Sequence, residues 1–259
     1  MENLKITLIQ TNTFWHDAEK NRNHFKKMIK NSGPTDLFVL PEMFTTGFTM
    51  EPELVAENPL GETHQWMKEI VSETGASMAG SYVVKEKDKY FNRLLFLAPD
   101  HSFTTYDKKH LFRMAEENNH YSPGTERKIV EIKGWKVLFL ICYDLRFPEW
   151  SRNGYHAETE MLDYDALIYV ANWPAVRASA WDALLKARAI ENHCYVAGLN
   201  RIGTDGTGKE YCGHSGVYNP KGETLYFAND NEEVKTITLE KASLDVYRKN
   251  FPAYLDASL

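Results

Sequence analysis

Short apolar runs alternate with amphipathic stretches along the chain. In most runs the apolar residues are consecutive or alternate with polar ones, which is typical of buried and half-buried strands. Three stretches have a helical period instead: Asp17–Lys30, the segment near Glu62–Thr74, and Ala178–Glu191. The expected strands are Leu4–Gln10, Asp36–Leu40, Ser77–Val84, Phe91–Ala98, Phe103–Tyr106, Lys128–Ile132, Lys136–Ile141, Ala166–Ala171, Cys194–Leu199, Gly213–Tyr218, Thr224–Phe227 and Val234–Leu239. Many strands with few helices predict an α/β protein in which layered sheets are covered by helices.

Length and composition favour one globular domain. A chain of 259 residues can fold as a single α/β or sandwich unit, and no linker, repeat or low-complexity tract divides it, so we predict one domain over 1–259. The hydrophobic content of 43% and the charged content of 25% are ordinary globular values. The net charge is −6 and the basic residues are scattered, which argues against nucleic-acid binding.

The cysteines and the apolar runs bear on the compartment. Three cysteines form no close pair, which argues against a disulfide framework. The first residues lack the pattern of a signal peptide, and no apolar run reaches the roughly 18 residues that a membrane helix needs. We therefore expect a soluble cytoplasmic protein.

One strand leads directly into a cysteine. Val137–Ile141 is an unbroken apolar run, and Cys142 follows it at once. A cysteine at the carboxyl end of a buried strand lies at a sheet edge, where open α/β folds usually bind ligands. Peptide N–H groups of the next turn can face a carbonyl that the thiol attacks, and nearby charges can favour the thiolate. An inert buried cysteine is the alternative at this position.

Two charged residues also follow predicted strands. Glu42 comes just after Asp36–Leu40, where a poorly solvated carboxylate can act as a proton shuttle. Lys108 follows Phe103–Tyr106, where a fixed ammonium can stabilise an oxyanion or a thiolate. Considered alone, each of the two residues is better explained as a solvated side chain at the end of a strand. Together with the cysteine they predict one site at one edge of a sheet.

These three segments resemble the signatures of the nitrilase, or carbon–nitrogen hydrolase, superfamily. Glu42 stands in Leu-Pro-Glu-Met-Phe, Lys108 stands two residues before a histidine in Tyr-Asp-Lys-Lys-His-Leu-Phe, and Cys142 begins Cys-Tyr-Asp-Leu-Arg-Phe-Pro-Glu. The resemblance covers nearly the whole chain, with all three signatures in the expected order. The frequent second glutamate of the superfamily matches Glu117, with the adjacent Glu116 as the alternative.

The resemblance implies an αββα sandwich, subunits that commonly form a homodimer, and catalysis without a metal or other cofactor. Glu42 would accept the proton of Cys142, whose thiolate would attack the carbon of a small amide. Lys108 and the backbone N–H of Tyr143 would hold the oxyanion, and water would then cleave a thioester intermediate. Glu117 would orient Lys108 or the substrate nitrogen.

A finer resemblance concerns the substrate. Ala171–Pro174 and the helix after it look similar to the bacterial omega-amidases, which deamidate 2-oxoglutaramate and 2-oxosuccinamate. The products are dicarboxylates, so the resemblance implies a cation and a small pocket with aromatic walls. Spacing does not choose among the candidates, which are Arg113, Arg177 and Arg201 for the carboxylate and Tyr143, Phe147 and Trp173 for the walls. Aliphatic amidase, N-carbamoyl amidohydrolase and nitrilase activities remain alternatives.

Several neighbouring residues have a structural interpretation. Asp144 and Arg146 lie close to the thiol, and we interpret them as a pair that holds the turn. Lys186–Asn192 is expected to pack behind the site or at a subunit interface. Cys194 lies inside an apolar run and is expected in the core, and Cys212 lacks the signature around Cys142.

Three other functions were weighed against this hypothesis. A papain-like hydrolase would use one of the nine histidines as its base, with His110, His120 and His214 as candidates, but no local signature supports it. A metal-dependent phosphoesterase would place Glu42, Asp144 and His214 around Mg²⁺, yet no ligand cluster is visible. A binding protein without activity would usually have lost one of the three key residues, and all three are present.

Overall fold

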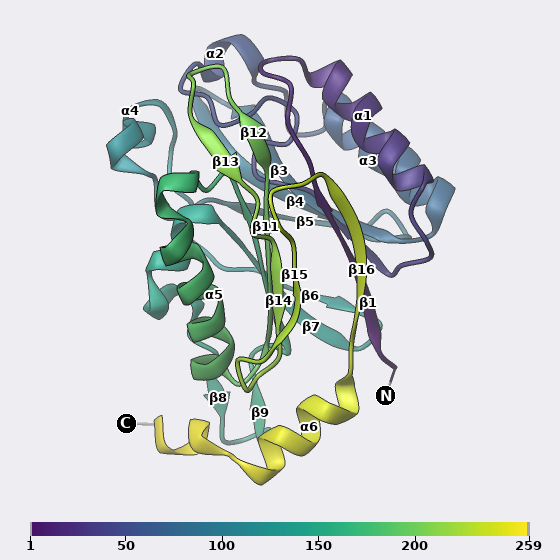
Figure 1. Ribbon diagram of the computed structural model, residues 1–259, viewed down its shortest axis with the longest axis vertical. Coiled ribbons are helices and arrows are strands. Elements are labelled where there is room, and N and C mark those ends of the chain that lie inside the picture. Colours follow the sequence, from purple (N-terminus) through teal and green to yellow (C-terminus); the bar gives the residue numbers. More distant parts are fainter. Residues whose placement is uncertain (1, 258–259) are drawn as a thin grey trace.

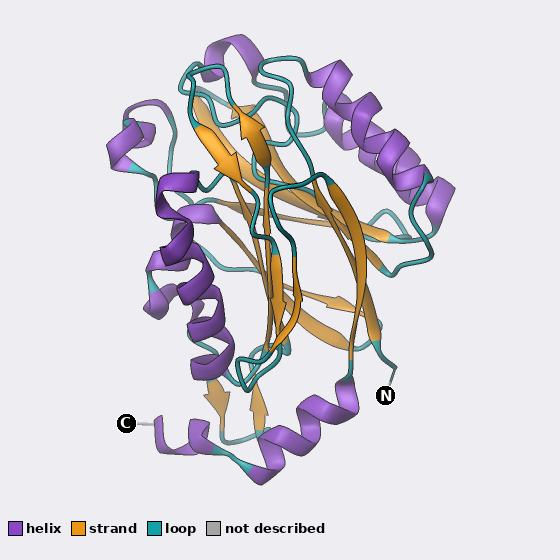
Figure 2. Cartoon of the chain, in the orientation of Figure 1, coloured by secondary structure: helices purple, strands orange, loops and turns teal. Residues whose placement is uncertain are grey.

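The structure is a computed structural model that describes residues 2–257. Two six-stranded sheets lie face to face, and helices cover their outer faces (Figures 1 and 2). The layers follow the order helix, sheet, sheet, helix, so the predicted αββα sandwich is confirmed. Most of the predicted strands are present within one to three residues of their expected bounds.

The first sheet has the strand order β16-β1-β2-β3-β4-β5. Its strands are β1 (Leu4–Gln10), β2 (Leu37–Val39), β3 (Ser77–Glu86), β4 (Lys89–Leu97), β5 (Phe103–Asp107) and β16 (Glu233–Leu239). Strands β1, β2 and β3 are parallel. Because β4 is antiparallel to both β3 and β5, the direction of β5 matches that of β2.

The second sheet has the strand order β15-β14-β11-β10-β7-β6. Its strands are β6 (Ile129–Ile132), β7 (Trp135–Ile141), β10 (Ala166–Ala171), β11 (Tyr195–Asn200), β14 (Gly216–Tyr218) and β15 (Thr224–Phe227). The central strands β7, β10 and β11 are parallel. They are buried along almost their whole length, which explains why their sequences are apolar runs rather than alternating ones.

The helices bury their apolar faces on the two sheets. The longer helices are α1 (Ala18–Lys30), α3 (Glu62–Thr74), α5 (Ala178–Asn192) and α6 (Lys241–Asn250), and the short ones are α2 (Pro52–Val55) and α4 (Glu117–His120). Helices α1 and α3 lie side by side (Figure 1), and Phe25 of α1 and Trp66 of α3 join Phe38 of β2 in one cluster on the first sheet. Trp181 of α5 joins the main cluster, which includes residues of both sheets. The three helices that the sequence predicts are therefore present, and each buries an apolar face on a sheet.

Some elements differ from those that the sequence predicts. The expected strand Gly213–Tyr218 begins only at Gly216, because Gly213 and His214 have φ angles of +71° and +58°, which a strand does not adopt. Other helices and strands were not predicted, because they are short or polar and their sequences have no clear periodicity. They are α2, α4, α6, the strand pair β8 (Tyr155–His156) and β9 (Met161–Leu162), and the hairpin β12 (Ile202–Thr204) and β13 (Glu210–Cys212).

The strand directions bring four segments to one region. Glu42 lies beyond the carboxyl end of β2, and Lys108 follows β5, which points the same way. Cys142 and Asn172 follow the parallel strands β7 and β10 of the facing sheet. The sandwich therefore gathers residues that are far apart in the sequence at the ends of its parallel strands, where such sheets usually carry their sites.

Candidate active site

Glu42 is fully buried and fully engaged in hydrogen bonds. Its Oε1 accepts from Lys108 Nζ and from Asn92 Nδ2, each at 2.8 Å. Its Oε2 accepts from the backbone N–H of Asn172 at 2.8 Å, and the Asn172 amide also donates to the Glu42 backbone carbonyl at 2.6 Å. The carboxylate is thus fixed by residues from both sheets.

Lys108 forms a second ion pair with Glu117. The ammonium donates to Glu117 Oε2 at 3.0 Å and to Oε1 at 3.1 Å. Glu117 also accepts from the backbone N–H of Phe112 at 2.6 Å, whereas Glu116 is exposed and has a φ of +59°. The geometry therefore selects Glu117 as the second acidic residue beside Lys108.

The backbone of Asp107, just before Lys108, leaves no space for a side chain at position 124. Gly124 donates to the Lys108 carbonyl at 3.0 Å, and a Cβ on this glycine would lie 2.0 Å from the backbone oxygen of Asp107. Such a contact requires the backbone itself to move. Gly124 therefore allows the segment after α4 to pack against the end of β5.

Cys142 lies in a strained turn at the end of β7. Its φ is +43°, in the left-handed region that non-glycine residues rarely adopt. The residue begins the 3-10 helix Cys142–Arg146, and its thiol lies within the electrostatic influence of Glu42 and Lys108. Strain of this kind is common at functional sites, where the surrounding structure holds it in place. The turn exposes the sulfur to the pocket described below.

Burial and charge act together on the ionisable groups of this cluster. Burial raises the pKa of Cys142 well above its ordinary value, and the Glu42 carboxylate raises it further, while Lys108 opposes both. Burial alone would lower the pKa of Lys108, but the carboxylates of Glu117 and Glu42 outweigh it and raise that pKa. Burial also raises the pKa of Glu117, against the effect of Lys108. We call Glu42, Lys108, Glu117 and Cys142 the buried cluster; its surroundings favour a neutral thiol and a charged ammonium.

Asp144 ties the cysteine turn to the lysine segment. Its buried carboxylate accepts from the backbone N–H of Ile141 at 3.0 Å, from the Tyr106 hydroxyl at 2.7 Å and from the backbone N–H of His110 at 3.0 Å. These bonds connect the residue before Cys142 with residues on either side of Lys108. The prediction that Asp144 holds the turn is therefore confirmed.

The predicted pairing of Asp144 with Arg146 is wrong. Among residues 2–257, Arg146 forms no ion pair, and its guanidinium lies 5.0 Å from the ring centroid of Trp173. The reason is that Asp144 points into the turn, towards Tyr106 and His110, while Arg146 is exposed on the other side. The arginine that holds this turn is Arg188 of α5 rather than Arg146. Arg188 is buried and donates to the Leu145 carbonyl at 2.6 Å.

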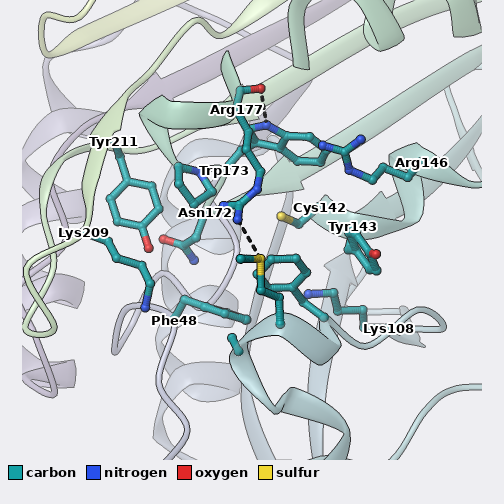
Figure 3. Close-up of a pocket in the computed structure, with 14 residues that line it drawn as sticks. Phe48, Lys108, Cys142, Tyr143, Arg146, Asn172, Trp173, Arg177, Lys209 and Tyr211 are labelled. Carbon is teal, nitrogen blue, oxygen red and sulfur yellow. Dashed lines mark hydrogen bonds between the residues drawn. The ribbon is translucent and has the colours of Figure 1, made fainter. Parts of the chain in front are cut away.

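A pocket with a cavity of about 130 Å³ opens beside Cys142 (Figure 3). Several of its walls are aromatic, and no Asp or Glu lines it. The lining residues are Phe48, Lys108, Phe112, Met114, Ala115, Cys142, Tyr143, Arg146, Asn172, Trp173, Pro174, Arg177, Lys209 and Tyr211. We call Arg146, Arg177 and Lys209 the cationic rim. Among the described residues, none of the three has a carboxylate within ion-pair distance.

Asn172 has a free acceptor in this pocket. It is 3% exposed, and its backbone N–H and side-chain NH₂ are both used on Glu42. Its Oδ1 has no hydrogen-bond partner among residues 2–257. A buried carbonyl oxygen without a partner is costly, so the pocket offers a bond to a ligand N–H at this point.

The structure brings some of the candidate substrate residues to the pocket and places others outside it. Tyr143, Trp173 and Arg177 line the pocket. Phe147 stacks on His110 at 3.9 Å between ring centroids, and Arg113 lines a neighbouring cavity with Phe147. Arg201 is fully buried and donates to Asn12 and to the Thr13 carbonyl, so it supports the wall behind Tyr211 rather than facing the cavity.

The pocket residues in and beside the hairpin β12–β13 were not predicted from the sequence. Lys209 and Tyr211 come from this hairpin, and the Tyr211 hydroxyl donates to Asp205 Oδ2 at 2.8 Å within it. Phe48 and Phe112 come from loops near Glu42 and Lys108. Their proximity to predicted catalytic residues was the one signal in the sequence that could have indicated Phe48 and Phe112.

The histidines and acidic residues of the rival functions lie elsewhere. No histidine lines the pocket. His110 is hydrogen-bonded to Asp144, and His214 to Asp182. Among the described residues, no group of three or more His, Cys, Asp or Glu side chains could hold a metal ion. In the same part of the chain, every helix is too short or too polar to cross a membrane.

The chain is similar to known proteins along most of its length. The sequence profile of the carbon-nitrogen hydrolase family matches residues 5–249. The chain is 45% identical to the omega-amidase YafV of Escherichia coli K12, over 99% of this chain and 98% of that protein. It is 32% identical to the 2-oxoglutaramate amidase of Bacillus subtilis, over 88% of this chain and 86% of that protein.

A solved structure is also closely similar. The CN-hydrolase superfamily protein XC1258 of Xanthomonas campestris, which carries an arsenic adduct in its active site, superposes with a TM-score of 0.96. The two chains are 43% identical, and the match covers 99% of this chain and 97% of the other. The backbone described above is therefore closely matched along nearly its whole length.

Proposed function

The chain belongs to the carbon-nitrogen hydrolase family and hydrolyses carbon–nitrogen bonds, and we propose that it is an omega-amidase. Its substrate would be a small molecule with an amide at one end and a carboxylate at the other, and 2-oxoglutaramate and 2-oxosuccinamate are the expected examples. Relatives named as omega-amidase and 2-oxoglutaramate amidase support this assignment.

The observation that carries the proposal is the charge of the pocket. Lys108 and Cys142 of the buried cluster line the pocket together with the three cations of the rim, and no acidic side chain is among the lining residues. A guanidinium binds a carboxylate through two parallel hydrogen bonds, which makes it suited to this group. A ligand with an amide at one end and a carboxylate at the other would match both ends of the pocket.

The chemical step begins with the transfer of a proton from Cys142 to Glu42. The burial of both side chains in one cluster supports the transfer, and the raised pKa of the thiol favours a proton that leaves as the sulfur attacks. The Sγ–carbon bond forms, and the carbonyl π electrons move to oxygen. Lys108 and the backbone N–H of Tyr143 stabilise the resulting oxyanion.

Glu42 then returns the proton to the amide nitrogen, and ammonia leaves with the C–N bond electrons. The acyl group remains on Cys142 as a thioester. Glu42 next takes a proton from water, the hydroxide attacks the thioester carbon, and the sulfur leaves as a thiolate that Glu42 reprotonates. Asn172 Oδ1, which lacks a partner among the described residues, can accept a hydrogen bond from the substrate NH₂. Glu117 keeps the Lys108 ammonium in place.

Assembly and location are further proposals. We infer a homodimer and a cytoplasmic location, with a small-molecule amide as substrate and neither nucleic acid nor membrane as partner. The support is the family resemblance for the dimer and the scattered basic residues for the absence of nucleic acid. Sedimentation of the purified chain tests the dimer directly.

The test of the activity is ammonia release from a panel of compounds. The panel contains 2-oxoglutaramate, 2-oxosuccinamate, pentanamide, an N-carbamoyl amino acid and a nitrile, each assayed with the wild type and with Cys142→Ala. We expect the two keto-acid amides to have the highest kcat/KM and the variant to be inactive. A nitrile or a neutral amide with a higher kcat/KM would reject the omega-amidase assignment, and full activity of the variant would reject the nucleophile.

A further inference from the structure

Two separate segments meet at the opening of the pocket. Arg177 ends the 3-10 helix Ala175–Arg177 before α5, and Met114 lies in the 3-10 helix Arg113–Ala115 before α4. The Arg177 guanidinium donates through Nη2 to Met114 Sδ at 2.9 Å, and the dashed line from Arg177 to a sulfur in Figure 3 marks this contact. Both side chains line the pocket. The contact therefore joins two walls of the opening.

Met114 is a weak partner for a charged donor. A thioether sulfur is a poor hydrogen-bond acceptor, whereas a guanidinium has five donors in a planar fork that matches a carboxylate. The Arg177 guanidinium also lies over the ring of Phe112, whose centroid is 5.4 Å away. A ligand carboxylate would form shorter and stronger bonds with Arg177 than the sulfur does.

The other two cations of the rim are held differently. Arg146 lies over the face of Trp173, a contact that leaves the edge of its guanidinium open to a ligand. Lys209 donates to Thr207 Oγ1 at 3.3 Å, within its own hairpin. A carboxylate can approach either one without displacing another residue of the pocket lining. At Arg177 the nitrogen Nη2 already donates to Met114, so a carboxylate that binds this nitrogen replaces the sulfur.

Met114 is free to move when it is displaced. Its side chain is 75% exposed, so it can swing into water without leaving a cavity behind. The segment that carries it is anchored just beyond, where Glu117 pairs with Lys108. The exchange of partners can therefore occur at the opening while the buried cluster stays in place.

We propose that Arg177 and Met114 form a latch that the substrate carboxylate opens. The inference rests on the proposed omega-amidase function and adds the residue that reads the acid end of the substrate. In the resting enzyme Met114 holds Arg177 across the opening. A substrate carboxylate takes over the guanidinium, the sulfur is released, and the amide reaches Cys142. A neutral amide has nothing to exchange for the sulfur, so Arg177 gives it no binding energy.

The experiment compares 2-oxoglutaramate with pentanamide, a neutral amide of similar length. The variants are Arg177→Gln, Met114→Leu and Met114→Glu, with Arg113→Gln as the matched control. Arg113 is a basic residue next to Met114 that lines the neighbouring cavity rather than this pocket. For each protein kcat and KM are measured with both substrates, and circular dichroism confirms folding.

The latch predicts opposite effects at the two positions. Arg177→Gln is expected to raise the KM for 2-oxoglutaramate about 10- to 100-fold, as the loss of a charge-assisted hydrogen-bonded pair does, with little change for pentanamide. Met114→Glu gives Arg177 a permanent carboxylate and is expected to raise the same KM about 10-fold. Met114→Leu keeps the size but removes the acceptor, and is expected to lower that KM about 2- to 5-fold. Arg113→Gln should leave both substrates unchanged.

The outcomes separate the latch from the function on which it rests. A wild type that prefers pentanamide would overturn the omega-amidase assignment before any variant is considered. If the wild type prefers 2-oxoglutaramate but Arg177→Gln keeps that preference, the latch is overturned and the function stands. An unchanged KM in Met114→Glu, or an Arg113→Gln effect equal to that of Arg177→Gln, would also overturn it.

Discussion

The buried cluster and the cationic rim are built on opposite principles. Glu42, Lys108 and Glu117 are at most 1% exposed, and each is bonded to other members of the cluster or to the backbone. Within residues 2–257, the side-chain cations of Arg177 and Lys209 have only a sulfur and a hydroxyl as hydrogen-bond acceptors. In the first region every charged side chain belongs to an ion pair, and in the second the described residues supply no carboxylate for the cations.

This contrast separates chemistry from recognition. Buried charges are tolerated only when they are paired, so the inner region is held in one geometry before any ligand arrives. The rim is partly solvated, so its cations can stand without partners at small cost and bind an anion when one enters. Changes in the cluster should therefore affect turnover, and changes at the rim should affect the choice of substrate.

The largest expected effect is the loss of the nucleophile. Cys142→Ala should lower kcat by at least about 10⁴-fold, since removal of a nucleophile leaves only binding and oxyanion stabilisation. Steady-state ammonia release measures it. Cys212→Ala is the matched control, because Cys212 is half-buried and does not line the pocket. Equal loss in both variants would mean that the effect is not specific to the turn after β7.

The next effect concerns the second carboxylate. Glu117→Gln should lower kcat about 10²-fold, because Lys108 would lose one of its two anionic partners and its position. Its neighbour Glu116 is exposed, so Glu116→Gln should leave kcat unchanged. The assay is kcat at saturating 2-oxoglutaramate. The reverse result would show that Glu116 is the functional acid despite the geometry.

A smaller effect tests the scaffold around the cluster. Tyr106→Phe removes the hydroxyl that donates to Asp144 and accepts from Trp150 Nε1 at 3.0 Å. The free energy of unfolding should fall by about 1–3 kcal/mol, because a buried donor and a buried carboxylate each lose a partner. Urea denaturation measures this change. The half-buried Tyr90 of β4 provides the control Tyr90→Phe, and a similar loss there would argue against a special role of the Asp144 bonds.

The smallest effect is expected from salt. Raising the ionic strength from about 0.05 M to about 1 M should increase the KM for 2-oxoglutaramate about threefold, because screening weakens the attraction between the exposed rim and an anion. The kcat should stay constant, since the buried cluster is shielded from the solvent. The KM for pentanamide provides the reference. A kcat that falls with salt would show that the two regions are not separate.

Much of the fold could be predicted from periodicity. The apolar runs before Cys142 and Asn172 are long enough to identify β7 and β10, and α5 has a clear helical face. The hairpin β12–β13 could not be found in this way. Its strands have three residues each and are mostly partly or fully exposed, so too few apolar positions alternate to be recognised.

The candidate site also contains residues that the sequence could predict and residues that it could not. Glu42, Lys108 and Cys142 stand in signatures that are local in sequence, so their identity could be predicted without coordinates, and their catalytic roles remain proposals. The residues that line the pocket could not be predicted in this way, because Arg146 and Lys209 reach the same pocket only after two sheets and a hairpin have folded. Arg113, Arg177 and Arg201 look equivalent in the sequence, yet one faces a neighbouring cavity, one lines the pocket and one is buried behind its wall.

The sequence by itself determined the strands of the two large sheets, that a thiol, a carboxylate and an ammonium follow three of them, and that the resemblance to one enzyme family is specific. These features depend on neighbours along the chain, through apolar periodicity and short motifs. The tertiary structure alone decided that Glu117 rather than Glu116 contacts the ammonium, that Asp144 does not pair with Arg146, and that Arg177 meets Met114. Such contacts depend on where side chains point after distant segments pack together, and no local pattern in the sequence records that direction.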